Sequence, residues 1–366
     1  MGNTYASSGV KYNLMDPFKK LAQRKARLTA KNLKRLKMRE VSASRGESAY
    51  VWEEPDSYKA FMIEGLGTKN RVADEVRKFT GKSHYDSIAQ DTVAMIVNDL
   101  IVVGADPQVV SAYFAVGSSD WFADEERVQD PINGWANAVN FAGAVWGGGE
   151  TPTLKEIIEL KAVDLSGSAI GIIQPKARLT LGDKLTPGDA IVLVESNGIH
   201  ANGLTLARAI AEKLPSRYAT LLPNGQSYGE TLLAPTHIYA KLVRTVFEAG
   251  LDIHYMVNIT GHGWRKLMRA NRKFSYIIEE LPLAQPVFQF IQEQSGADDA
   301  EMFGNFNMGA GFAIFMPESD AKKARDTIRS KLGLHSVIAG FVEEGSKQVI
   351  IRPKNLVFKA ESLGVR

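Results

Sequence analysis

The pattern of hydrophobic and polar positions predicts strands that alternate with helices along most of the chain. In the first half, short apolar or alternating runs predict strands over residues 58–63, 109–116 and 165–173. Longer apolar stretches in the same half predict helices over residues 87–103 and 132–145. The segment 42–55 is polar and contains Gly, Ser and Glu, which is typical of a loop.

The second half begins with the continuous apolar run 190–195, which is typical of a buried strand. A loop over 196–203 and a helix that continues to Leu214 follow it. Further helices are expected over residues 235–249, 287–294 and 319–332. Further strands are expected over residues 273–279, 311–315, 337–342 and 349–352. This succession predicts layered α/β or α+β domains.

Chain length predicts two domains, because 366 residues exceed the size at which a single hydrophobic core usually stops growing. The segment 174–187 contains two prolines and a Leu-Gly-Asp turn, and we place the domain boundary there. The expected division is a basic N-terminal arm and loop (1–57), an N-terminal domain (58–176) and a C-terminal domain (177–366).

The chain contains no cysteine, which excludes disulfides, thiolate metal sites and cysteine nucleophiles and fits a reducing compartment. The N-terminal residues lack an apolar signal region, and no run approaches the roughly 18 apolar residues of a membrane span. We therefore expect a cytoplasmic protein without a membrane partner.

The net charge of +3 is unevenly distributed along the chain. Ten basic residues and no acidic ones lie from Lys19 to Arg39, and they form a basic arm. Asp16-Pro17 is a typical helix start, so the arm is expected to be helical. The arm could contact phosphates of a nucleotide or a nucleic acid, or it could be a solvated helix face packed on the body. The second interpretation is favoured, because no aromatic residues interleave with the charges as single-strand binding requires. Nucleic acid is therefore not an expected partner.

A glycine-containing loop, Glu-Gly-Leu-Gly-Thr-Lys (64–69), follows the first predicted strand. Two glycines allow the backbone to approach an anion closely, and the Thr hydroxyl and Lys ammonium can contact phosphate oxygens. The spacing differs from that of a P-loop, so a purely structural turn is an equally good interpretation.

The helix predicted over 87–103 is apolar except for three polar residues, Asp91, Asn98 and Asp99. At about 100° per residue, Asn98 lies about 20° and Asp99 about 80° from Asp91 around the helix axis. Buried carboxylates need a partner, and Mg²⁺ is the favoured one, since carboxylate and amide oxygens suit a hard cation. The alternative is a helix cap with a buried ion pair to Lys or Arg.

Other loops also carry candidate chemistry. The glycines 147–149 could deliver Glu150 and Thr151 to a site, or they could simply end a helix. The loop 196–203 places His200 and Asn202 between a strand and a helix, where ligands often bind. Two later glycine-rich loops, 259–263 and 306–311, have the same character.

Taken together, these segments resemble the phosphoribosylformylglycinamidine cyclo-ligase (aminoimidazole ribonucleotide synthetase) family over nearly the whole chain. The matching motifs, in order, are Gly-Leu-Gly-Thr-Lys (65–69), Gln-Asp-Thr-Val-Ala-Met (90–95), Val-Asn-Asp-Leu (97–100), Gly-Gly-Glu-Thr (148–151), Ser-Asn-Gly (196–198) with His200 and Asn-Gly (202–203), Ala-Pro-Thr (234–236), Ile-Thr-Gly (259–261) and Phe-Asn (306–307) with Gly309.

The resemblance implies a two-domain PurM-like fold, in which the N-terminal domain pairs with its twin as a closed β-barrel across a homodimer and the C-terminal domain is α/β. ATP and the substrate, formylglycinamidine ribonucleotide, would lie between the domains. The implied reaction closes the imidazole ring to give aminoimidazole ribonucleotide, ADP and phosphate, a step of purine biosynthesis.

The resemblance also implies roles for individual residues. ATP and its phosphates would contact Gly65, Gly67, Thr68, Lys69, Asn98, Glu150 and Thr151. Mg²⁺ would be held by Glu64, Asp91 and Asp99. Catalysis would involve Asp91, Asp99 and His200, and the substrate would contact Asn202, Thr260 and Asn307.

This sequence departs from the family pattern at several positions. Glu64 stands where the family usually has Asp, Asn258 replaces a usual His, and His262 interrupts a triple glycine. The segment 45–52 contains little glycine, unlike the family's mobile segment, and the basic arm overlaps a family segment that closes over ATP. Two alternatives therefore stay open: an ATP-dependent kinase or activator of another small molecule, and a non-catalytic nucleotide-binding protein.

Overall fold

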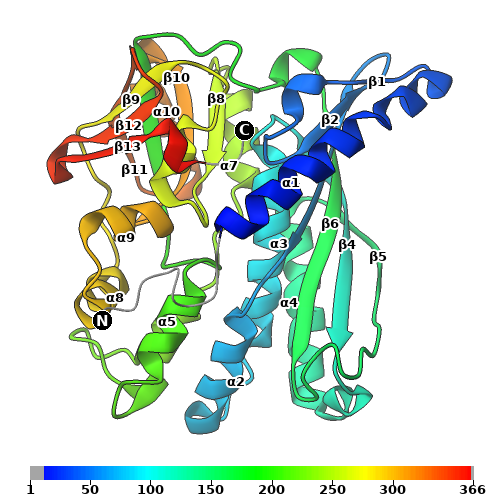
Figure 1. Ribbon diagram of the computed structural model, residues 1–366, viewed down its shortest axis with the longest axis vertical. Coiled ribbons are helices and arrows are strands. Elements are labelled where there is room, and N and C mark those ends of the chain that lie inside the picture. The colour runs from blue at the N-terminus through cyan, green and yellow to red at the C-terminus, as the bar shows by residue number, and fades with distance from the viewer. Residues whose placement is uncertain (1–11, 364–366) are drawn as a thin grey trace.

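The computed structural model describes residues 12–363, which form two domains, each built on one mixed β-sheet (Figure 1). The N-terminal sheet uses strands from residues 39–173, and the C-terminal sheet uses strands from residues 189–359. The predicted α/β architecture is thus confirmed. No helix among residues 12–363 is both long and apolar enough to cross a bilayer.

The N-terminal sheet has six strands, with the spatial order β1 (Arg39–Glu40), β2 (Tyr50–Glu53), β3 (Tyr58–Gly65), β6 (Val163–Ile173), β4 (Asp106–Val116) and β5 (Val145–Glu150). Neighbouring strands are antiparallel except for β4 and β5, which are parallel. Along β6 the burial alternates strictly, so that one face of the sheet packs on helices.

Helices α3 (Tyr85–Ile101) and α4 (Glu125–Ala142) cover that face, and α2 (Lys69–Thr80) packs beside α3. The opposite face is open on the right of Figure 1. It exposes apolar side chains from four adjacent strands, namely Phe61, Ile63, Val109, Val145 and Ile170.

The basic arm is helical, as predicted. It consists of α1 (Tyr12–Arg27) and the 3-10 helix η2 (Ala30–Leu36), but α1 begins before the expected start and contains Pro17 in its interior. The apolar side chains Phe18 and Leu28 are 74% and 65% exposed, so they do not form a stripe packed on the body.

The C-terminal sheet has seven strands, with the spatial order β13 (Leu356–Lys359), β12 (Gln348–Ile351), β9 (Phe274–Ile278), β11 (Ser336–Glu344), β7 (Asp189–Glu195), β10 (Ala310–Pro317) and β8 (Tyr255–Asn258). Only β9 and β12 are parallel. The continuous apolar run predicted as a buried strand is β7, at the centre of this sheet.

The helices of this domain are α5 (Leu204–Ala211), α6 (Tyr228–Leu232), α7 (Ala240–Glu248), α8 (Pro286–Ser295), α9 (Asp299–Asn305) and α10 (Glu318–Leu332). Short 3-10 helices complete the chain: η3 (Ser42–Ser44), η4 (Ser119–Ala123), η5 (Lys176–Arg178), η6 (Arg217–Ala219), η7 (Gly263–Met268), η8 (Arg352–Lys354) and η9 (Ala360–Ser362).

Several local predictions are wrong. The segment 42–55 is not entirely a loop, because β2 pairs with β3 in the sheet. The glycines 147–149 do not end a helix but belong to the edge strand β5. The helix expected from residue 235 begins only at Ala240, because residues 234–239 run extended along α3 and bond to its polar side chains. The pairing of two N-terminal domains into a barrel stays a prediction.

Candidate active site

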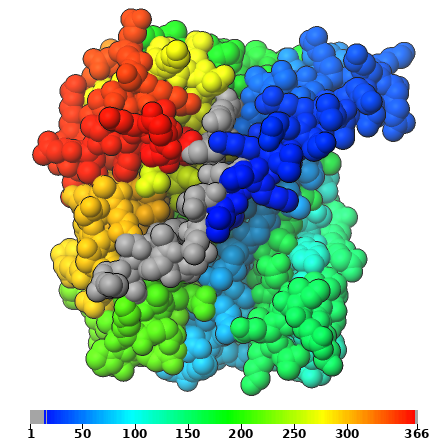
Figure 2. Space-filling model, in the orientation of Figure 1, coloured from blue at the N-terminus to red at the C-terminus, as the bar shows by residue number. Residues whose placement is uncertain are grey.

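A pocket of about 300 Å³ lies where the loop after β3 and helix α3 meet the loops of the C-terminal domain. It is lined by Lys19, Glu64, Met95, Asp99, Asn202, Asn258, Thr260, Gly261, His262, Lys266 and Arg269. Lys19 belongs to α1, which lies on the N-terminal domain beside its boundary with the C-terminal domain (Figure 2). The pocket therefore joins the arm and both domains.

Two carboxylates face each other in this pocket. Burial and, to a smaller extent, the negative charge of Asp99 together raise the pKa of Glu64 to about 7. Glu64 Oε2 accepts a bond of 3.3 Å from the backbone N–H of Gly65, and Asp99 Oδ1 accepts one of 2.6 Å from Asn258 Nδ2. Such a pair binds cations or protons readily, because either one relieves the repulsion between the two groups.

Cations surround these carboxylates. The Lys266 ammonium is buried and donates to the backbone oxygen of Asn258, at 3.2 Å, and to the Thr260 hydroxyl. Burial and the neighbouring positive charges, chiefly Lys266, lower the pKa of His262 to about 4. The pocket is therefore rich in positive charge, which suits a phosphate-bearing ligand.

The loop 64–69 connects β3 to α2 as the sequence suggests. Gly67 has φ +76°, a left-handed conformation that favours glycine, and Thr68 stands at the N-terminal end of α2. Glu64 borders the pocket, but Lys69 turns inward from this loop.

Lys69 is completely buried and pairs with the equally buried Asp91 at 2.7 Å. The Lys69 ammonium also donates to the Ala234 backbone oxygen at 2.9 Å. Asp91 Oδ1 accepts bonds from the Thr236 N–H, at 2.8 Å, and from its hydroxyl. Burial lowers the pKa of Lys69 and raises that of Asp91, and each partner's charge opposes this effect.

The expected metal set is not assembled. Asp91 forms the buried ion pair that was the alternative interpretation, and among residues 12–363 no three side chains of the metal-binding type gather closely enough to hold an ion. The Asp91 carboxylate neutralises the Lys69 ammonium in this structure. Glu64 and Asp99 stay together in the pocket.

Asn98 is also engaged in the structure rather than directed at a ligand. Its Nδ2 donates to the His237 backbone oxygen at 2.7 Å, and its Oδ1 accepts from the Tyr239 N–H at 2.9 Å. Gln90 Nε2 donates to the Thr236 backbone oxygen at 3.0 Å. The polar side of α3 thus fastens residues 234–239, which we call the strap, to the N-terminal domain.

The four residues predicted from the later loops are not all together, because Asn202 and Thr260 line the pocket whereas His200 and Asn307 do not. His200 is buried. The backbone of His200 has φ +58°, and the centroids of the His200 and His237 rings are 6.3 Å apart. Burial lowers the pKa of His200 well below its usual value, so its ring is neutral. Asn307 holds the loop after β7 together by accepting from Ser196 Oγ at 2.9 Å and donating to the Gly198 oxygen at 2.9 Å.

Glu150 and Thr151 lie far from this arrangement in the sheet, at the exposed end of the edge strand β5. Lys266 and Arg269 also line the pocket, although neither was expected from the sequence. A signal was available, because three basic residues, Arg265, Lys266 and Arg269, lie within six residues after the predicted glycine loop 259–263. Lys19 of the arm lines the pocket, which favours the interpretation that the arm contacts phosphates.

Comparison with known proteins places this geometry in a family. The AIR synthase related protein family matches residues 46–173 with its N-terminal domain and residues 186–352 with its C-terminal domain. A phosphoribosylformylglycinamidine cyclo-ligase of Methanobrevibacter smithii is 32% identical over 335 residues, 89% of this chain and 91% of the relative. The enzyme of that name from Thermococcus kodakarensis is 37% identical over 80% of this chain and 81% of the relative.

Two solved structures share the fold at low identity. AaThiL complexed with AMPPCP and TMP has a TM-score of 0.59 and 17% identity, and the match covers 86% of this chain and 90% of that chain. The hydrogenase maturation protein HypE in complex with ATP has a TM-score of 0.55 and 18% identity, with coverage of 76% and 81%. The chain belongs to the AIR synthase related protein family, among relatives named phosphoribosylformylglycinamidine cyclo-ligase.

Proposed function

We propose that this chain closes the imidazole ring of formylglycinamidine ribonucleotide in an ATP-dependent reaction that releases aminoimidazole ribonucleotide, ADP and phosphate. The observation that carries the proposal is the pocket in which Glu64 and Asp99 face Lys19, Lys266 and Arg269 between the two domains. The identity of 32–37% to curated cyclo-ligases supports the choice of substrate.

The proposed reaction has two steps. The formyl amide oxygen attacks the γ-phosphorus of ATP, and the bond from that phosphorus to ADP breaks. The amidine nitrogen then attacks the activated formyl carbon and loses a proton, and phosphate leaves with the former amide oxygen. Such chemistry needs positioning and charge neutralisation more than a protein nucleophile. Lys19, Lys266 and Arg269 would bind and orient the phosphate oxygens.

The carboxylates Glu64 and Asp99 fit a Mg²⁺ ion, since both supply oxygen ligands and a cation would offset the burial and the repulsion that raise the pKa of Glu64 to about 7. A bound Mg²⁺ would neutralise charge on the phosphate oxygens. Asp91 would not ligate it, because Asp91 is paired with Lys69. Asp91 and the strap would instead position the loop 64–69.

A second candidate function is an ATP-dependent kinase or activator of a different small molecule. It is motivated by Glu64, Asn258 and His262, which depart from the cyclo-ligase pattern and all line the pocket. A third, a nucleotide-binding protein without turnover, is motivated by the same residues. The acceptor that stimulates ATP cleavage distinguishes these functions.

The test is ADP release from Mg²⁺-ATP with formylglycinamidine ribonucleotide, with thiamine monophosphate, and with neither. We expect stimulation by the first compound alone. Asp99→Asn should lower the stimulated rate at least a hundredfold, while the exposed Asp326→Asn should leave it unchanged. Stimulation by thiamine monophosphate instead, or an unchanged rate in Asp99→Asn, would contradict the substrate or the site, respectively.

We also propose that the chain is a homodimer. The open face of the N-terminal sheet presents Phe61, Ile63, Val109, Val145 and Ile170, and such an apolar patch on four adjacent strands is typical of an interface. A second copy of the same sheet would cover it and close a barrel.

A further inference from the structure

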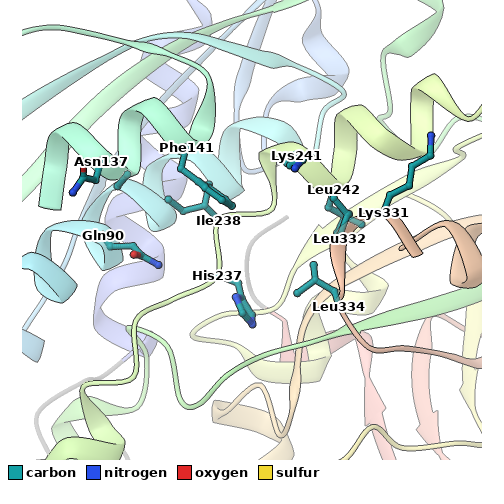
Figure 3. A pocket seen from close by; sticks show the side chains of 11 residues that line it. Gln90, Asn137, Phe141, His237, Ile238, Lys241, Leu242, Lys331, Leu332 and Leu334 are labelled. Carbon is teal, nitrogen blue, oxygen red and sulfur yellow. The ribbon is translucent and has the colours of Figure 1, made fainter. Parts of the chain in front are cut away.

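A second cavity lies at the domain junction, with a volume of about 380 Å³. It is bordered by α3 and α4 of the N-terminal domain and by the strap, α7 and the end of α10 of the C-terminal domain (Figure 3). It is not part of the candidate active site. Gln90 borders this cavity, whereas Met95 and Asp99 border the other, about 140° and 180° around α3.

The walls of this junction cavity are apolar and come from both domains. Phe141 of α4 and Ile238 lie on one side, with Leu242, Leu332 and Leu334 across from them (Figure 3). Phe141 is 58% exposed, which is a large exposure for an aromatic side chain beside other apolar groups. Both the volume and the lining are typical of sites for small organic molecules.

The polar groups of the junction cavity are cationic or neutral. Lys241 and Lys331 border it, and neither lysine has a carboxylate partner within the part of the chain that the structure describes. Gln90, Asn137 and His237 supply hydrogen-bonding groups, and no Asp or Glu lines the cavity. Two unpaired lysines at the rim of an apolar hollow favour a ligand with an anionic group and an apolar body.

We propose that the junction cavity binds a small amphipathic anion, an apolar ring or chain that carries a phosphate, carboxylate or sulfonate group. The apolar body would lie against Phe141 and the leucines, and the anionic group would contact Lys241 and Lys331. The proposal does not depend on the reaction catalysed in the other pocket.

Binding would also stabilise the junction between the domains. The strap residues His237 and Ile238 line the cavity, and the same strap is bonded to α3 through Gln90 and Asn98. A ligand that contacts α4, the strap and α10 together would bind only the native arrangement. It should therefore raise the melting temperature, and the rise should continue logarithmically with ligand concentration above Kd.

The test uses the fluorescent probe 8-anilinonaphthalene-1-sulfonate, which is an apolar ring system with one sulfonate, and its uncharged analogue N-phenyl-1-naphthylamine. The full-length protein is titrated with each probe. The charge-reversal variant Lys241→Glu/Lys331→Glu is compared with Lys82→Glu/Lys322→Glu, which makes the same change in net charge at exposed lysines elsewhere. A third variant, Phe141→Ser, removes part of the apolar wall at an exposed position.

We expect the sulfonate probe to bind the wild type at one saturable site and to raise its melting temperature. The Lys241→Glu/Lys331→Glu variant should weaken that binding at least tenfold, and the matched control should change it less than twofold. Phe141→Ser should weaken the binding of both probes. No saturable binding, or equal binding by the charge-reversal variant and its control, would overturn the proposal. Competition by ATP in the wild type would also overturn it, because it would place the probe in the other pocket.

Discussion

Asp91 sits completely buried in the middle of an apolar helix, and the structure stabilises its charge with a single ammonium group. Lys69 lies 2.7 Å away, and Thr236 donates to the same carboxylate through its N–H, at 2.8 Å, and its hydroxyl. A buried ion pair contributes little net stability, but loss of one partner leaves an uncompensated charge in a medium that cannot solvate it. Each residue of the pair therefore requires the other.

This dependence predicts a non-additive pair of substitutions. Lys69→Met should destabilise the protein by about 3–5 kcal/mol, and Asp91→Asn by a similar amount, because each leaves the other charge buried and alone. The double variant Lys69→Met/Asp91→Asn leaves no buried charge and should be more stable than either single variant. Urea unfolding of the four proteins measures this, and additive losses would contradict the ion pair.

Glu64 predicts a pH dependence of stability. Its pKa is raised to about 7 in the folded protein by burial and by Asp99, against 4.5 ordinarily. The folded state therefore binds a proton that the unfolded state releases between these values. The stability that protonated Glu64 contributes is fully present below pH 4.5 and is lost as the pH rises through 7. This loss lowers the free energy of unfolding by at most about 3 kcal/mol.

The variant Glu64→Gln removes this titration, so its free energy of unfolding should change less between pH 5 and pH 8 than that of the wild type. Urea unfolding at several pH values compares the two slopes. Identical slopes would show that Glu64 does not titrate in this range in the folded protein.

At the scale of elements, the strap explains why α3 carries polar residues on an otherwise apolar surface. Residues 234–239 cannot continue α7, because their backbone groups are bonded to Gln90, Asp91 and Asn98. The backbone groups of the strap thus bond to these three side chains and not to a helical turn of their own. These bonds connect the two domains.

Asn98→Ala should therefore loosen the strap. It leaves the His237 oxygen and the Tyr239 N–H without their partners, which should cost about 2–4 kcal/mol. Amide hydrogen exchange in residues 234–239 should become faster, while exchange in α8 should not change. The control Asn137→Ala, at an exposed position of α4, should have no such effect. Unchanged exchange in the strap would contradict its role.

The elements with strong periodicity could be predicted from the sequence. The apolar runs of α3 and β7 and the alternation of β6 each have one dominant packing solution. The short strand β2 and the glycine-rich edge strand β5 could not, because pairing with distant strands rather than local preference decides their conformation. For the same reason the sequence indicated that the polar residues of α3 need partners, but not that Lys69 and the strap supply them.

At the scale of the whole molecule, the open face of the N-terminal sheet predicts the oligomeric state. The chain has a mass of 40.1 kDa, so a dimer has a mass of 2 × 40.1 = 80.2 kDa. Light scattering should give the larger value. Ile63→Asp/Ile170→Asp places charges on two exposed positions of this face and should give the monomer mass, because charged groups would be desolvated in the interface.

Substitution of two exposed leucines outside the sheet, Leu221→Asp/Leu283→Asp, serves as the control and should leave the dimer intact. A monomeric wild type at micromolar concentration would contradict the dimer. A dimer that survives the substitutions on the sheet face would place the interface elsewhere.

The proposed function requires that the pocket between the domains close an imidazole ring at the expense of ATP. The most direct measurement incubates the protein with Mg²⁺-ATP and formylglycinamidine ribonucleotide and quantifies ADP and the diazotisable aminoimidazole in the same sample. We expect both products to appear together in a 1:1 ratio. ADP without aminoimidazole, or neither product from protein that binds ATP, would contradict it.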